Sequence, residues 1–175
     1  ATSRDLKVVF SGGVGAGKTT AIRAISESAT LSTDVHISSG EVMGGKTMTT
    51  VGLDYGECHL GDQWTLKLFG TPGQDRFRFM WDILGRGAAG AIVLLDATQP
   101  GALVQLDLFI DAFSPHVPAG AIVVGIGRSG QPGALPSDAF SERLEARGMT
   151  LPVLSVDVRQ RADVLLLVET LACIL

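Results

Sequence analysis

The feature that most constrains this chain is a glycine-rich stretch, residues 11–20, which reads SGGVGAGKTT. It contains the pattern G-x-x-x-x-G-K-T and lies between an apolar run, residues 6–10, and a helix-like stretch, residues 18–28. A strand, a loop of this pattern and a helix form the phosphate-binding loop of P-loop proteins, where backbone N–H groups and the helix start face the phosphates. The pattern predicts a bound nucleoside triphosphate at the end of the first strand.

Two side chains of this loop carry the expected chemistry. Lys18 is expected to reach the β- and γ-phosphates, and the Thr19 hydroxyl is expected to bind Mg²⁺. A glycine-rich turn with a chance lysine is the alternative, and the strand and helix on either side argue against it. The predicted nucleotide-binding residues of the loop are Gly12, Gly13, Val14, Gly15, Ala16, Gly17, Lys18, Thr19 and Thr20.

Apolar runs alternate with helix-like stretches along the rest of the chain. Residues that alternate in period two on both sides of Gly61-Asp62 predict a hairpin. The order of elements predicts an α/β, three-layer P-loop domain with a mostly parallel six-stranded sheet and one antiparallel edge strand. The chain length favours a single domain, residues 1–175. The expected strands are 6–10, 49–60, 64–69, 91–96, 121–125 and 153–156, and helices are expected at 18–28, 103–113, 138–147 and 160–174.

Composition excludes several classes of partner. The chain is 46% hydrophobic and 18% charged, with a net charge of −4 and no basic tract, which argues against nucleic acid as a partner. No apolar run is long enough to span a membrane, and no basic-then-apolar leader is present. The two cysteines are too few for a disulfide framework. These features together predict a cytoplasmic protein.

Four segments resemble a known family. They are GGVGAGKTT (12–20), TTVGLDYGE (49–57), LFGTPGQDRF (68–77) and AIVLLDAT (91–98). In this order they are similar to the phosphate loop, switch I, switch II and following strand of Ras-like small GTPases. The TPGQDRF form most resembles bacterial small GTPases of the MglA type and the conservon-encoded GTPases of actinobacteria. The resemblance covers nearly the whole chain and implies a Mg²⁺-dependent switch that binds GTP and GDP and hydrolyses GTP slowly.

The resemblance implies roles for residues in both switches. The Thr50 hydroxyl would close over Mg²⁺ when the γ-phosphate is present, with Thr49 as the alternative if the register shifts by one. The Gly73 N–H would contact the γ-phosphate, and Gln74 would orient the attacking water, because a carboxamide can position a water without titrating. Catalytic roles are thereby assigned to Gln74, Lys18 and Thr50, and metal binding to Thr19 and Thr50.

The sequence departs from the family at the metal site. Most Ras-like proteins have an aspartate at the position of Gly70, where it supports Mg²⁺ through water; MglA-type proteins also lack it. Asp75 follows five residues later and is a poor geometric substitute. We therefore expect Mg²⁺ to depend on Thr19, a switch threonine, phosphates and water.

A second departure concerns the base. Gly127 and Gly130 stand where Ras-like proteins have the asparagine and aspartate that read guanine. Arg128 keeps a long basic stem that can lie over a base, and Ser155 begins a loop similar to the one whose backbone caps the base. Asp157 is either a replacement carboxylate or a helix N-cap. The preference for GTP over ATP therefore rests on the resemblance.

The surface that changes with the nucleotide is expected at residues 44–54 and 72–84. The family implies a regulatory partner, a roadblock/LC7-fold dimer, and an effector in polarity, motility or signalling that contacts the switch regions. Lys46 or Arg76 is a further candidate for neutralising charge during hydrolysis. One alternative is a pseudo-GTPase adaptor with degenerate base recognition. Another is a P-loop enzyme that uses ATP to phosphorylate a small molecule.

Overall fold

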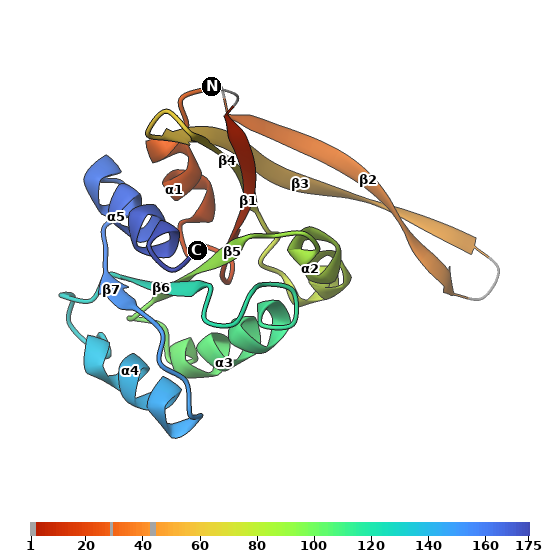
Figure 1. The fold of residues 1–175 in the computed structure, drawn as a ribbon. Helices are drawn as coiled ribbons and strands as arrows, with labels where there is room; N and C mark the ends of the chain where they lie inside the picture. The colour runs from red at the N-terminus through yellow and green to blue at the C-terminus, as the bar shows by residue number, and fades with distance from the viewer. Residues whose placement is uncertain (1–2, 29, 43–44) are drawn as a thin grey trace.

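A seven-stranded sheet runs through the centre of the molecule (Figure 1). The computed structural model describes residues 3–28, 30–42 and 45–175, and it describes side chains for 3–28, 30 and 52–175. The strand order is β2-β3-β4-β1-β5-β6-β7. The strands are β1 Arg4–Ser11, β2 Leu31–Val42, β3 Gly45–Leu60, β4 Trp64–Gly70, β5 Gly90–Asp96, β6 Ile122–Gly127 and β7 Val153–Ser155.

The predicted α/β class is confirmed, with one addition to the sheet. Five strands form the parallel part of the sheet, in the order β4-β1-β5-β6-β7. Strand β3 pairs with β4 in the antiparallel direction. The prediction of six strands omitted β2, which pairs with β3 on its other side. The antiparallel strand is therefore not at the edge. Residues 31–38 (LSTDVHIS) do alternate, with Leu31, Thr33, Val35 and Ile37 at every second position, so the sequence carries a period-two signal for this strand that the prediction missed.

The two strands β2 and β3 form an arm that extends away from the helices (Figure 1). The pairing between β3 and β4 runs from Leu60↔Trp64 to Asp54↔Gly70. The part of β3 that precedes Asp54 continues outward in its pairing with β2, where Thr50 lies opposite His36. The hairpin predicted around Gly61-Asp62 is confirmed, and it places Asp54 at the point where the arm leaves the sheet.

Helices cover both faces of the sheet. Helices α1 (Lys18–Ile25) and α5 (Arg161–Ala172) pack together on one face, and α2 (Arg78–Gly85) and α3 (Ala102–Phe113) pack on the other, with α4 (Ser137–Ala146) beside α3 (Figure 1). Every residue of the central strand β5 is buried, as expected for a parallel strand covered on both faces. Among the described residues, no helix combines the length and apolar character that a membrane crossing requires.

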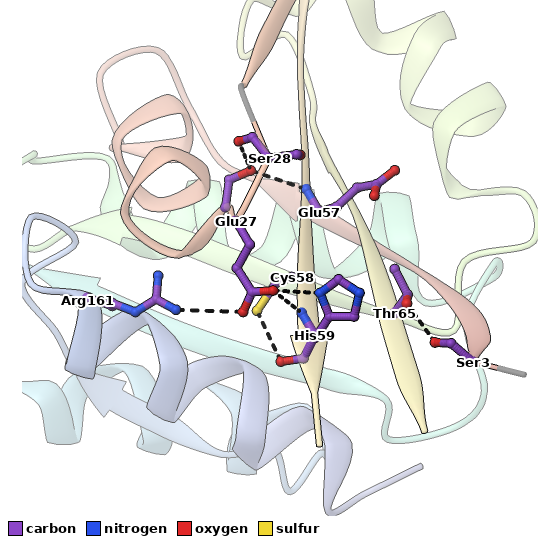
Figure 2. A network of polar contacts seen from close by, with 9 residues as sticks. Ser3, Glu27, Ser28, Glu57, Cys58, His59, Thr65 and Arg161 are labelled. Atoms are coloured by element: carbon purple, nitrogen blue, oxygen red, sulfur yellow. Dashed lines mark hydrogen bonds and ion pairs between the residues drawn. The ribbon is translucent and has the colours of Figure 1, made fainter. Parts of the chain in front are cut away.

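Polar contacts fix the far end of α1, the helix that begins at the phosphate loop. Just beyond this helix, the Glu27 carboxylate lies 2.5 Å from Nδ1 of His59 on β3 and 3.8 Å from Nη2 of Arg161 on α5 (Figure 2). The hydrogen bond to His59 lowers the pKa of Glu27. These groups are largely exposed, so each pair is worth at most about 1 kcal/mol. Their effect is to hold α1 between the sheet and α5.

Candidate functional site

The glycine-rich loop between β1 and α1 has a backbone that only glycine can adopt. Gly12 and Gly17 have φ of +151° and +98°. A Cβ on Gly12 would lie 2.4 Å from the carbonyl oxygen of Leu94, and one on Gly17 would lie 2.7 Å from Cγ2 of Val158. Because α1 starts directly after Gly17, its first N–H groups are free to face an anion at the loop.

Lys18 is the cation of this loop. Its Nζ donates hydrogen bonds to the carbonyl oxygens of Gly12, at 2.7 Å, and Gly13, at 2.6 Å. Burial lowers the pKa of Lys18 to about 8, although the negative charge of Asp54 opposes that effect. The side chain is only 9% exposed. A buried ammonium of this kind is poorly solvated and gains from a nearby anion such as a phosphate.

Thr19 contacts an acidic side chain that the sequence analysis missed. Its Oγ1 donates a hydrogen bond to Oδ2 of Asp54 on β3. Asp54 lies opposite Gly70 in the register of β3 and β4. That register could have been counted from the predicted hairpin turn, which would have placed Asp54 beside position 70. The contact with Thr19 itself depends on how α1 packs against the sheet.

The segment after β4 lies directly on the phosphate loop. A Cβ on Gly73 would lie 2.6 Å from the carbonyl carbon of Gly13 and 2.6 Å from the backbone nitrogen of Val14. The preceding residue, Pro72, accepts a hydrogen bond at 2.7 Å from Nε1 of Trp81. Trp81 is 2% exposed and packs against the core. A buried side chain of α2 thus fixes the loop that carries Gly73.

The remaining predicted switch residues are placed less centrally. Gln74 follows Gly73, is exposed, and precedes the short 3-10 helix η1 (Asp75–Phe77). The Arg76 guanidinium lies 4.6 Å from the centre of the Phe77 ring. Three predicted switch residues belong to strand β3 within the β2–β3 arm: Thr50, its alternative Thr49, and Lys46. The structure describes the backbone at these positions but not the side chains.

A cavity of about 700 Å³ lies beside the phosphate loop, along the C-terminal ends of β5, β6 and β7. In parallel α/β sheets, ligands bind at this end of the strands. The volume is within the range of small-molecule sites. The cavity is lined by residues 15–20, Leu95, Asp96, 127–129, Gln131, 155–159 and Asp163.

Arg128 forms one wall of this cavity. It is a non-glycine residue with positive φ, 55°, and its guanidinium forms an ion pair with Asp96 at the end of β5. Burial raises the pKa of Asp96, but hydrogen bonds from Thr98 and Arg128 outweigh it, so the pKa lies below its ordinary value. The ion pair anchors the stem of Arg128 in the cavity wall.

Asp157 lies on the opposite side and is engaged by Arg159. Arg159 donates from Nε to Oδ1 at 2.9 Å and from Nη2 to Oδ2 at 2.8 Å. These bonds lower the pKa of Asp157 to about 2. The interpretation of Asp157 as a helix N-cap is wrong, because Gln160 occupies the N-cap of α5. The nearby Ser155 hydroxyl lies 2.7 Å from the hydroxyl of Ser137.

The structure thus brings most of the predicted nucleotide-binding residues to one place. Gly15, Ala16, Gly17, Lys18, Thr19, Thr20, Arg128 and Ser155 line the cavity. Gly12 and Gly13 contact Lys18, and Gly73 packs on Gly13 and Val14. Gln74 is not among the residues that line the cavity.

Comparisons with known proteins agree with this geometry. A family model described as "Conserved hypothetical ATP binding protein" matches residues 10–113, more than half of the chain. An uncharacterized protein of Methanocaldococcus jannaschii is 34% identical over 95 residues, 54% of this chain and 53% of that protein. Ras-related protein Rab-7b of Mus musculus is 32% identical over 110 residues, 61% of this chain and 49% of that protein. The chain spans about half the length of these curated relatives.

A solved structure shares the fold over nearly the whole chain. The G domain of the T. maritima FeoB iron transporter aligns with a TM-score of 0.65 and covers 97% of this chain and 98% of its own. The sequence identity is 15%, so this likeness shows the fold alone. It confirms the predicted G-domain-like α/β architecture around the phosphate loop.

Proposed function

The chain belongs to the family described as "Conserved hypothetical ATP binding protein", and from that premise we propose that it binds a purine nucleoside triphosphate with Mg²⁺ and switches conformation on the γ-phosphate. GTP is the first candidate ligand, and slow hydrolysis to GDP and phosphate is the expected reaction. The observation that carries the proposal is the cavity itself, which joins the phosphate loop to the ends of three strands. We propose that the protein acts as a molecular switch in the manner of the MglA-type small GTPases.

The phosphate end of the cavity is built for a polyanion. Lys18 is buried and its pKa is lowered to about 8, so it is still mainly charged at neutral pH, and a bound phosphate would stabilise this poorly solvated cation. The first turn of α1 adds the positive end of its dipole. Gly73 already lies against the loop, which supports the proposal that its N–H contacts the γ-phosphate.

The residues beside Lys18 also suit Mg²⁺. Mg²⁺ binds oxygen ligands and retains several waters, with one or two protein groups completing the site. The Thr19 hydroxyl and the Asp54 carboxylate are such groups and lie in direct contact. Bound between the phosphates and these residues, Mg²⁺ would neutralise charge on the phosphate oxygens. Thr50 is proposed as a further ligand.

At the base end of the cavity, the comparisons and the two residues Arg128 and Asp157 bear on whether guanine or adenine is bound. The resemblance of the four motif segments to Ras-like small GTPases favours guanine, and one relative is by its name Ras-related, whereas the family description names ATP. Arg128 is anchored by Asp96, which supports its stem as a platform for the base. Asp157 is engaged by Arg159, so a guanine would have to compete with that arginine for its carboxylate.

We propose that a partner protein reads the switch segments. Gln74 is exposed beside Gly73, a position from which it can orient a water once the nucleotide and partner are bound. On α2, Phe79 is 40% exposed and Ile83 is 55% exposed, so this helix presents apolar surface. Such a surface suits the proposed roadblock/LC7-fold regulator or an effector in polarity, motility or signalling.

A second candidate function is a pseudo-GTPase adaptor. It is favoured by the engagement of Asp157 with Arg159 and by the glycines at positions 127 and 130, because together they leave the base end with few groups to read a base. The buried Lys18 argues against it, since a buried cation is costly to keep without a ligand.

Calorimetric binding of GDP, a GTP analogue, ADP and an ATP analogue to nucleotide-stripped protein with Mg²⁺ tests the proposal. A strong preference for guanine nucleotides would support the GTP switch. A strong preference for adenine nucleotides would instead identify ATP as the ligand. Equal or absent binding would favour the adaptor. Release of phosphate from GTP without any acceptor would exclude a small-molecule kinase, and its absence over hours would argue against hydrolysis.

A further inference from the structure

We propose that Asp54, on β3, supplies the carboxylate that supports Mg²⁺ at Thr19, in place of the side chain that position 70 lacks. The inference rests on the proposed function, because it concerns the metal that would accompany the nucleotide. Three independent observations carry it: the register of β3 and β4, the space around Gly70, and the hydrogen bond from Thr19.

The register brings Asp54 to the end of β4. Asp54 and Gly70 are opposite each other in the antiparallel pair, and residues opposite each other in such a pair have their Cβ positions about 5 Å apart. A group on β3 at this point can therefore reach the same region as a group on β4. This end of the sheet is also where the phosphate loop leaves β1, the neighbour of β4.

Asp54 and Ile22 together fill the space around Gly70. A Cβ placed on Gly70 would lie 3.1 Å from the Cβ of Asp54, 3.4 Å from its Oδ2 and 3.1 Å from Cδ1 of Ile22. A carboxylate on residue 70 would thus compete with Asp54 for one volume. Glycine at position 70 and aspartate at position 54 are complementary, because the first leaves room for the second.

The hydrogen bond from Thr19 sets the direction of the hydroxyl. A threonine hydroxyl has one hydrogen to donate and two lone pairs to offer. Since its hydrogen is donated to Oδ2 of Asp54, the lone pairs remain available to a metal ion. The charge of Asp54 also acts on Lys18, whose pKa it raises against the effect of burial. The carboxylate therefore lies within electrostatic reach of both groups of the loop.

Other carboxylates near the cavity are engaged elsewhere. Asp75 is exposed, and its carboxylate lies 3.4 Å from Nη2 of Arg78. Asp96 pairs with Arg128, and Asp157 pairs with Arg159. Asp54 is the acidic residue that contacts the proposed metal-binding hydroxyl, Thr19, among the side chains the structure describes.

The first test is Asp54→Asn, which keeps an oxygen to accept the Thr19 hydrogen bond but removes the charge. We expect the affinity of the protein–GDP complex for Mn²⁺, measured by electron paramagnetic resonance, to fall roughly 10- to 100-fold. We expect GDP affinity in EDTA to stay equal or to rise, because a negative charge near the phosphates is gone. If Asp54 had a purely structural role, Asp54→Asn would weaken both the Mn²⁺ affinity and the GDP affinity in EDTA. Mn²⁺ affinity within twofold of wild type would overturn the proposal.

The second test moves the carboxylate between strands. Asp54→Gly alone should lose Mn²⁺ affinity, and adding Gly70→Asp should recover most of it, since the two positions share one volume. A matched control, Asp75→Asn, should leave Mn²⁺ affinity unchanged. A double variant no better than Asp54→Gly would overturn the interchange of the two positions. If wild type binds no GDP with or without metal, the proposed function fails first; if it binds GDP and Asp54→Asn changes nothing, the Asp54 assignment alone fails.

Discussion

Raising the pH is expected to stabilise the nucleotide-free protein through Lys18. Burial lowers the pKa of this ammonium from 10.5 to about 8, so between these values the unfolded chain binds more protons at Lys18 than the folded chain. Stability rises with pH wherever the unfolded state binds more protons. The charged Lys18 therefore opposes folding below about pH 8, and the penalty is relieved as the pH rises toward 10.5.

The magnitude follows from the difference between the two pKa values. Each pKa unit is worth about 1.4 kcal/mol. With a fall from 10.5 to about 8 and a side chain only 9% exposed, the full effect is about 3 kcal/mol. Between about pH 7 and about pH 9.5, we expect roughly 2 kcal/mol of this to appear.

The assay compares wild type with Lys18→Met, whose side chain has a similar length and no charge. Urea unfolding of both nucleotide-stripped proteins across this pH range isolates Lys18, because the other titrating groups cancel in the difference. The free energy of unfolding of wild type should rise by about 2 kcal/mol relative to the variant. A difference that stays flat with pH would refute the reasoning. Saturating GDP should abolish the rise in wild type, because phosphates keep Lys18 charged, and Lys18→Met should bind no GDP in calorimetry.

Three further predictions concern the switch and the base. Trp81→Phe keeps an aromatic ring but removes the donor to the Pro72 carbonyl, so chemical denaturation should show a loss of about 1–2 kcal/mol; an unchanged midpoint would show that the bond does not anchor the loop. Gln74→Ala should preserve nucleotide affinity while phosphate release slows roughly 10- to 100-fold, and full turnover would make Gln74 a surface residue only. Arg159→Ala should raise the pKa of Asp157 from about 2 toward its ordinary value in NMR titration and increase the ratio of GDP to ADP affinity; an unchanged ratio would exclude Asp157 from base reading.

The sequence by itself determined the class of the fold and the position of the glycine-rich loop between β1 and α1. Both depend on local patterns: buried strands read as apolar runs, and the glycines of the loop are needed for backbone conformations and close approaches within a few residues. The strand β2 was missed although residues 31–38 alternate in period two, because the polar residues 38–41 (SSGE) end that pattern before the strand ends.

The tertiary structure alone decided which side chains meet around the predicted nucleotide. Asp54 contacts Thr19 only because α1 packs against the sheet where β3 lies beside β4. At the base end, Asp96 reaches Arg128 across parallel strands. The sequence separates the members of each pair by more than thirty residues, and no local pattern encodes such a contact. Packing and strand register determine it, because they fix which distant residues share one volume.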